Sequence, residues 1–215
     1  MATVGATVPS RTPRRAVQPP VDKVAARRSE LAAAALKTLA ELGYARTSLR
    51  EIAQNSEFSH GVLHYYFRDK VDLITHCVQQ YNAQCVTRYD TVVATAATPE
   101  ELTEGFLRKL CQTLVEDAHQ HRLWYDLRSQ SMFEPPFRDD VAAIDQSLER
   151  MIGRVVTRYA ELTGSTPLLS SSTIYALLDG LFQQALLRQL AGEPSAAEDL
   201  RTAVGQLLPT LLRPA

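Results

Sequence analysis

Cysteine is scarce in this chain: only three of its 215 residues are Cys. Cys77, Cys85 and Cys111 are odd in number and too widely spaced for a zinc cluster, and they fit a reducing compartment. No apolar run approaches the ~20 residues that a membrane-spanning helix needs. The first 20 residues lack the apolar segment of a secretory signal. We therefore expect a cytoplasmic protein that has no membrane partner.

Catalytic signatures are missing as well. The sequence contains no nucleotide-binding glycine loop, no GxSxG elbow and no HExxH motif. His119 and His121 flank one residue, but no carboxylate or Cys stands at a suitable spacing to complete a metal site with them. We expect no enzymatic activity, no cofactor and no metal centre.

Strand signals are absent too, whereas helical ones are frequent. We find no alternation of apolar and polar residues and no Asn-Gly hairpin, which favours an all-α fold. Residues 1–20 are rich in Pro, Thr, Ala and Arg and predict a disordered basic arm. From Val21 apolar residues recur at three- and four-residue steps, and Gly43 stands where a C-terminal cap belongs.

Capping residues predict three further helix starts. Ser48 and Glu51 have the spacing of a capping box, and Ser59 can cap a short helix that follows. Asp69 can cap a fourth helix that we expect to continue to about Thr95. The remaining helices are expected at 99–118, 122–132, 135–164, 171–190 and 195–212. About nine helices result, divided into a head at 21–70 and a larger domain at 71–215.

Charge is distributed unevenly between these two parts. Residues 1–70 hold 11 Lys and Arg against 6 Asp and Glu, whereas residues 71–215 hold 12 against 18. A basic head followed by an acidic remainder suggests two different partners, with nucleic acid as the partner of the head. A chance distribution of surface charge is the alternative.

One stretch has an unusual composition: residues 56–73, SEFSHGVLHYYFRDKVDL. It holds too many polar side-chain groups for a core helix and too many aromatic side chains for an ordinary surface helix. Three helices within the first 70 residues, the second and third short and joined by a tight turn, predict a helix-turn-helix. In that motif the last of these helices enters the major groove of DNA. His60, His64 and Tyr65 would then face DNA, while Val62, Leu63 and Phe67 pack inward.

The head also resembles a known family. LAAAALKTLAELGYARTSLREIAQNSEFSHGVLHYYFRDKVDLI, residues 31–74, is similar to the N-terminal domain of TetR/AcrR-type transcriptional regulators. The resemblance is carried by Ala33-Ala34, ELGY at 41–44, Thr47-Ser48, Ile52-Ala53, Ser59-x-Gly61-x-Leu63, Tyr65-Tyr66-Phe67 and Lys70-x-x-Leu73.

Carried over by position, the resemblance implies a set of DNA contacts. Two departures stand out: Ser56-Glu57 replaces the usual small residue and Gly in the turn, and His64 stands where Tyr is common. Tyr66 has an alternative role in packing between the third and fourth helices. Arg50 is added because it lies on the exposed face of the second helix. The expected contacts are Thr47, Ser48, Arg50, Ser59, His60, Gly61, His64, Tyr65, Tyr66 and Lys70.

The last two helices carry the expected dimer interface. Their apolar residues exceed what a terminal helix pair on a small monomer should expose, so pairing with a second copy would form a four-helix interface. The alternative is that both helices cap the core of their own chain. The expected interface residues are Leu177, Leu181, Leu186, Leu200, Val204 and Leu208.

Rings and methionines between residues 70 and 190 suggest an effector pocket, because such side chains suit apolar, shape-tolerant cavities. Each of them could instead belong to the core. Arg128 either meets an anionic group of the effector or pairs with an Asp or Glu of the chain. The expected pocket residues are Tyr81, Phe106, Trp124, Tyr125, Arg128, Met132, Tyr159 and Phe182.

These observations together with the resemblance predict a ligand-responsive transcriptional repressor. It would bind a palindromic double-stranded DNA operator as a homodimer and be released by a small apolar or amphipathic effector. One alternative is an activator or constitutive DNA binder without an inducer. A second is a helical enzyme or interaction module whose head has lost DNA binding.

Overall fold

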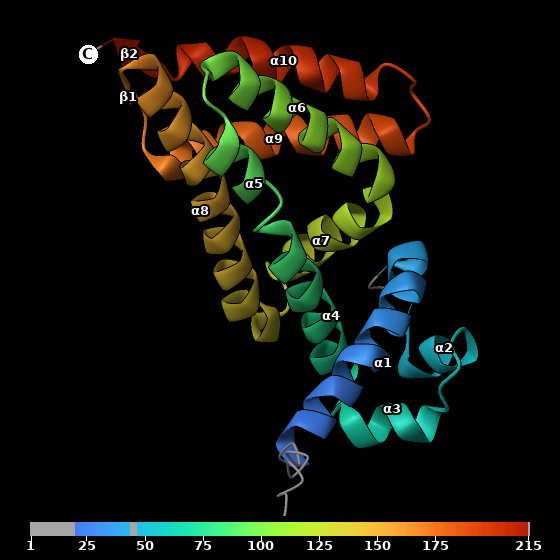
Figure 1. Ribbon diagram of the computed structural model, residues 1–215. Coiled ribbons are helices and arrows are strands. Elements are labelled where there is room, and N and C mark those ends of the chain that lie inside the picture. Colours follow the sequence, from blue (N-terminus) through green and yellow to red (C-terminus); the bar gives the residue numbers. More distant parts are fainter. Residues whose placement is uncertain (1–19, 44–46, 215) are drawn as a thin grey trace, which may run out of the picture.

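The computed structural model describes residues 20–43 and 47–214 and is helical almost throughout (Figure 1). The expected all-α class is therefore confirmed. The arm predicted at 1–20 lies outside the described residues, apart from Pro20, which begins α1. In chain order the elements are α1 (Pro20–Leu42), α2 (Leu49–Gln54), α3 (His60–Tyr66), α4 (Lys70–Cys85), α5 (Asp90–Thr95), α6 (Pro99–Glu116), α7 (Ala118–Gln130), η1 (Pro135–Phe137), α8 (Arg138–Thr163), β1 (Ser165–Pro167), α9 (Ser171–Leu190), α10 (Ala196–Thr210) and β2 (Leu212–Pro214).

The capping signals in the head are confirmed. Ser48 accepts a hydrogen bond from the backbone N–H of Glu51, whose carboxylate accepts one from the N–H of Ser48 in return. Ser59 caps α3 by accepting a hydrogen bond from the N–H of Val62, and Asp69 caps α4 by accepting one from the N–H of Asp72. Gly43 follows α1 with φ +78°, a left-handed conformation that residues with a Cβ rarely adopt.

The fourth helix is shorter than expected. α4 ends at Cys85, and α5 is a separate helix. Side chains from elsewhere occupy the intervening turn: Lys109 donates a hydrogen bond to the carbonyl of Arg88, and Arg154 donates one to the carbonyl of Val86. These donors are distant in sequence, so local periodicity around Thr95 could not reveal them.

A short antiparallel ladder was also not predicted. β1 pairs with β2, with Thr166 opposite Arg213. Each strand has only three residues, too few for an alternating pattern to stand out from the sequence. The ladder ties the segment after α10 to the segment between α8 and α9.

Two hydrophobic clusters divide the molecule. The first joins α1 to α4 with residues of α7, η1 and α8, and it includes Leu31, Leu63 and Phe67, all fully buried. The second lies among α6, α8, α9 and α10. α7 lies between them, with α1 on one side and α9 on the other (Figure 1). The core of the head is therefore completed by helices of the larger domain.

Candidate functional site

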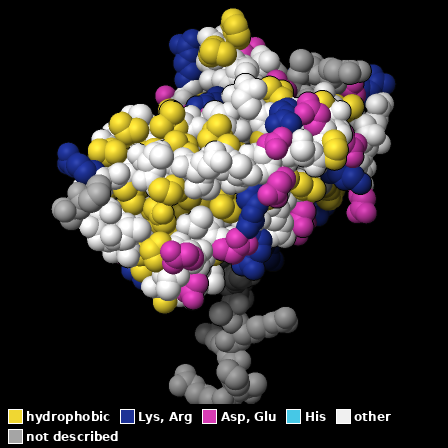
Figure 2. All heavy atoms as spheres, turned by 90° about the horizontal axis from the view of Figure 1, so that it is seen from above, with side chains coloured by type: hydrophobic (Ala, Val, Ile, Leu, Met, Phe, Trp, Pro, Cys, Tyr) yellow, Lys and Arg dark blue, Asp and Glu magenta, His cyan; other side chains and the backbone are white. Residues whose placement is uncertain are grey.

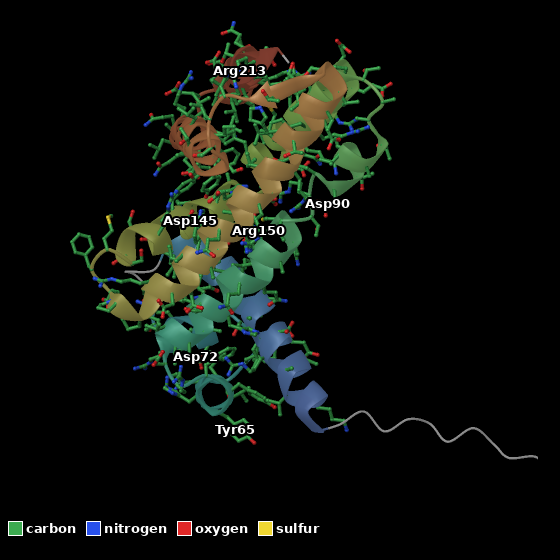
Figure 3. The ribbon with its side chains drawn as sticks, turned by 90° about the vertical axis from the view of Figure 1, so that its left-hand side faces the viewer. Tyr65, Asp72, Asp90, Asp145, Arg150 and Arg213 are labelled. Carbon is green, nitrogen blue, oxygen red and sulfur yellow. The ribbon has the colours of Figure 1, made fainter. Side chains whose placement is uncertain are left out.

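One face of α3 is exposed at the end of the molecule. The side chain of Tyr65 is 80% exposed and lies at the lower tip in Figure 3. His60 and His64 are exposed on the same helix, whereas Leu63 and Phe67 are fully buried beneath it. The aromatic rings and polar nitrogens of α3 therefore face outward, above buried apolar side chains, as the sequence predicts.

α2 and the turn before it place fewer side chains on the exposed face than the sequence predicts. Arg50 and Ser48 are exposed, with the Ser48 hydroxyl engaged in its cap. Thr47 is only 3% exposed, and its hydroxyl donates a hydrogen bond of 2.7 Å to the carbonyl of Gly43. The side chain of Thr47 therefore closes the turn after α1 and does not lie on the outer face.

The end of α3 is held by a residue that sequence reasoning did not place in the site. Arg28 of α1 donates one hydrogen bond to the carbonyl of Tyr66 and another to Asp72 of α4, each 2.8 Å long. Its guanidinium also lies 4.5 Å from the centre of the Phe67 ring. Tyr66 is half-buried and Lys70 is partly buried, which lowers the pKa of Lys70. No local pattern reveals Arg28, because its partners are about 40 residues away.

A cavity of about 100 Å³ lies in the larger domain, between α4, α6, α7, α8 and α9. Its walls are mostly apolar and aromatic, with a few polar groups, which is the usual character of a small-molecule site. The lining residues are Val78, Tyr81, Asn82, Cys85, Arg88, Tyr89, Phe106, Leu110, Thr113, His121, Trp124, Tyr125, Ile144, Leu148, Met151, Ile152, Tyr175, Leu178, Asp179 and Phe182.

The expected pocket residues divide between this cavity and other places. Tyr81, Phe106, Trp124, Tyr125 and Phe182 line it, whereas Arg128, Met132 and Tyr159 do not. Arg128 pairs with two carboxylates of its own chain. Met132 is 67% exposed beyond the end of α7, because α7 ends at Gln130, and Tyr159 packs in a neighbouring part of the core.

A polar network stands at one side of the cavity. Arg88 donates hydrogen bonds to Thr113 and to Asp117, the latter 2.7 Å long. The Nε2 atom of His121 lies 2.8 Å from the Thr113 hydroxyl and 3.4 Å from that of Tyr81. Burial, together with the nearby positive charge of Arg88, lowers the pKa of His121 to about 4. His121 is therefore neutral at pH 7.

A second network joins α7, α8 and α9. Arg128 forms ion pairs with Asp179, at 2.5 Å, and with Asp145, at 3.3 Å. Tyr125 donates a hydrogen bond to Asp179, and Tyr175 donates one to Asp145. Burial raises the pKa of both phenols, so both remain protonated donors. Tyr175 and Asp179 were missed as cavity residues because the partners in this network lie 17 to 54 residues apart along the chain.

α7 connects the cavity to the head. His121, Trp124 and Tyr125 line the cavity, while Arg122 donates hydrogen bonds to the carbonyls of Ala40 and Glu41 at the end of α1. The Trp124 ring belongs to the cluster that contains the head. Its Nε1–H is buried and has no hydrogen-bond partner among the described residues.

Comparison with known proteins decides the family. Residues 31–77 match the model described as bacterial regulatory proteins, tetR family, and residues 99–213 match that of the C-terminal part of BetI-type transcriptional repressors. The chain belongs to the TetR family. This TetR-family protein is a DNA-binding transcriptional repressor and not an enzyme.

Individual relatives agree with this assignment. The chain is 25% identical over 190 residues to the HTH-type transcriptional regulator BetI of Cronobacter sakazakii, covering 85% of this chain and 89% of the relative. Among solved structures it is similar to a transcriptional regulator of Saccharomonospora viridis in complex with choline, with TM-score 0.69, 16% identity and coverage of 87% and 98%. FadR of Bacillus subtilis in complex with stearoyl-CoA gives TM-score 0.66, 17% identity and coverage of 84% and 96%.

The expected interface residues of this TetR-family protein are only partly exposed. Leu177 is 42% exposed and Leu181 is half-buried, whereas four others pack inside their own chain. α10 lies against α6 and α9, so the residues of its apolar face contribute to the core. The four buried residues are Leu186, Leu200, Val204 and Leu208.

An exposed face nevertheless remains on α9. Leu177, Gly180, Gln184 and Leu187 are exposed at helical spacing, with Leu187 57% accessible. Seen from above, the end of the molecule that carries α6 and α10 shows hydrophobic side chains gathered beside charged ones (Figure 2). Apolar surface of this kind on a helix is a common feature of subunit contacts.

None of the helices between Pro20 and Pro214, outside the gap at 44–46, has the length and apolar character of a membrane span. The same part of the chain holds no group of three or more His, Cys, Asp or Glu side chains that could hold a metal ion.

The buried neutral His121 makes stability depend on pH. Its pKa is about 4 in the folded chain against an ordinary 6.5, so protonation favours the unfolded state. Stability should be complete above pH 6.5 and fall as the pH falls toward 4, by about 2 to 3 kcal/mol at about pH 4.5. We expect His121→Gln to remove this part of the loss, as measured by urea unfolding at neutral and acidic pH. His119→Gln, at an exposed position on the same helix, is the control; equal pH dependence in both variants would contradict the assignment.

Proposed function

We propose that this repressor binds a palindromic operator as a dimer and is released by a small apolar or amphipathic effector. It would act in the cytoplasm, where the DNA is. The observation that carries the proposal is the exposed face of α3, with Tyr65, His60 and His64 outward above fully buried Leu63 and Phe67. Side chains of these types hydrogen-bond to base edges and phosphates when such a helix enters the major groove.

The other proposed DNA contacts are chosen by the exposure of their side chains and by their position near α3. Arg50 provides a positive charge on the exposed side of α2, and Gly61 leaves room for close approach of the DNA backbone. Ser48 and Ser59 stand at helix starts, and Tyr66 and Lys70 at the junction of α3 and α4. We leave the side chain of Thr47 out, because it is buried. The proposed DNA face therefore comprises Ser48, Arg50, Ser59, His60, Gly61, His64, Tyr65, Tyr66 and Lys70.

Two helices would transmit effector binding to this face. α4 carries Cys77 in the head cluster and Tyr81 at the cavity, one turn apart. α7 carries Trp124 at the cavity and Arg122 at the end of α1. An effector that shifts either helix would change the orientation of the head. Affinity for the operator must then fall by the same factor as affinity for the effector falls on DNA binding.

The cavity favours a compact effector. Its volume of about 100 Å³ suits a small molecule better than a long acyl chain. Several rings surround the space, and aromatic faces attract quaternary ammonium groups. Because the similar regulator of Saccharomonospora viridis was solved with choline, choline is the first effector to test, with octanoate as an anionic amphipathic comparison.

Operator binding is tested by selecting DNA from a random pool with purified protein. We expect a palindrome bound ~10³-fold or more above random DNA. Arg50→Ala should weaken binding to it by about 1–3 kcal/mol, because Arg50 contacts a base edge or a phosphate. Binding would be measured by fluorescence anisotropy at two salt concentrations.

Arg150→Ala is the matched control, since Arg150 is exposed on α8, away from α3 (Figure 3). Weak binding that selects no sequence and disappears with modest salt would contradict the proposal. It would mean that only the basic charge of the head attracts DNA.

Effector release is tested by adding choline or octanoate to the protein–operator complex. We expect one of them to lower operator affinity. If that effector accepts a hydrogen bond from Trp124 Nε1–H, Trp124→Phe weakens its binding about three- to tenfold, the contribution of one hydrogen bond. Isothermal titration calorimetry gives this affinity directly.

Tyr159→Phe serves as the control for this variant, because Tyr159 is a ring outside the cavity lining. Release by neither compound would contradict this choice of effectors. Failure of a wider panel of small molecules would favour the alternative, a regulator without an inducer.

Dimerisation is tested on the exposed face of α9. Leu177→Glu places a charge among apolar side chains, so we expect it to shift the protein from dimer to monomer in sedimentation experiments and to weaken operator binding with it. Val24→Glu changes a comparably exposed residue, 50% against 42%, at the opposite end of the molecule. A Leu177→Glu variant that stays dimeric would show that α9 is not the interface.

A further inference from the structure

The recognition helix carries a pair of histidines in direct contact. His60 and His64 stand four residues apart on α3, and both side chains are exposed. Their Nε2 atoms lie 3.0 Å apart, and their ring centres 4.3 Å apart.

This spacing suits a metal ion. Two imidazole nitrogens, each about 2.1 Å from one ion, are separated by about 3.0 Å at a right angle and about 3.4 Å at the tetrahedral angle. The same i, i+4 placement on a helix lets the two histidines of HExxH proteins share one zinc ion. Imidazole nitrogen is a preferred ligand of Cu²⁺, Ni²⁺ and Zn²⁺. We propose that His60 and His64 together bind one divalent transition-metal ion on the recognition helix.

Metal binding requires a change of tautomer in one of the two rings. In the observed contact one Nε2 carries the hydrogen that the other accepts. Coordination requires both rings in the tautomer with hydrogen on Nδ1, so that both Nε2 lone pairs reach the ion. The rings remain neutral, and α3 gains a charge of +2. Since only two protein ligands are present, water fills the other coordination positions, and binding is reversible and weaker than at a structural zinc site.

The ion would compete with the operator. Both rings lie on the face proposed to meet base edges, and a ring that holds a metal through Nε2 cannot offer that nitrogen to DNA. The hydrated ion also occupies the space in front of the helix. By reciprocity, the metal lowers operator affinity by the factor by which the operator lowers metal affinity. This consequence rests on the proposed function, whereas the metal site itself does not.

Metal binding is tested first, on the full chain without a purification tag. Ni²⁺ is titrated into the protein by calorimetry, with a chromogenic chelator as competitor. We expect one ion per chain. His64→Tyr should weaken Ni²⁺ binding about tenfold or more, because one of two ligands is lost. Tyr is chosen because it is common at this position in the TetR family. The double variant His60→Gln, His64→Gln should abolish Ni²⁺ binding.

His119→Gln is the matched control, because His119 is an exposed histidine on α7, a helix that does not carry the proposed pair. It should bind Ni²⁺ like the unmodified chain. Absence of Ni²⁺ binding by the unmodified chain, or undiminished Ni²⁺ affinity in folded His64→Tyr, would overturn the proposed site. Circular dichroism of each variant separates a lost ligand from a lost fold.

The effect on DNA is measured next, on the selected operator. Saturating Ni²⁺ should lower the operator affinity of the unmodified chain, and a chelator should restore it. For the double variant His60→Gln, His64→Gln, which has lost both ligands, the ratio of affinities with and without Ni²⁺ should stay near one, whatever its operator affinity. Ni²⁺ that binds without changing operator affinity would overturn the competition. Failure of the metal-free chain to bind any operator would overturn the proposed function and leave the Ni²⁺ titration standing.

Discussion

The position of α7 constrains most of what this protein can do. One side of the helix supplies rings to the cavity, and the other packs on α1 and binds its last carbonyls through Arg122. Those carbonyls have no partner within α1, so the contact completes a helix end as well as joining two domains. Any molecule that enlarges the cavity against α7 therefore acts on the support of the DNA-binding head.

The charged groups around the cavity are largely satisfied by partners within the chain. Arg88 is paired with Asp117, and Asp179 with Arg128 and Tyr125. A ligand that needed either charge would have to break a pair that is partly removed from water, which is costly. Among the described residues the buried N–H of Trp124 has no hydrogen-bond partner, so a hydrogen bond to it would not disrupt another one.

Local signals in the sequence were sufficient for the helices of the head. The capping box at Ser48, the cap at Ser59 and the left-handed Gly43 each depend on residues within a few positions, and each was predicted. Contacts between distant segments were not. The apolar stripe of α10 was compatible with either a partner chain or its own core, and the fold assigns most of it to the core. Periodicity identifies which face is apolar, but it does not identify what covers that face.

The head and the larger domain share one hydrophobic cluster, in which Leu31 and Phe67 belong with Leu127 and Phe137. The division expected near residue 70 therefore runs through one continuous hydrophobic cluster. A head transplanted from another family member would leave mismatched volumes against α7 and α8, at a cost comparable to that of core substitutions. New DNA specificities should therefore arise in this lineage by surface changes on α2 and α3 more readily than by recombination of whole domains.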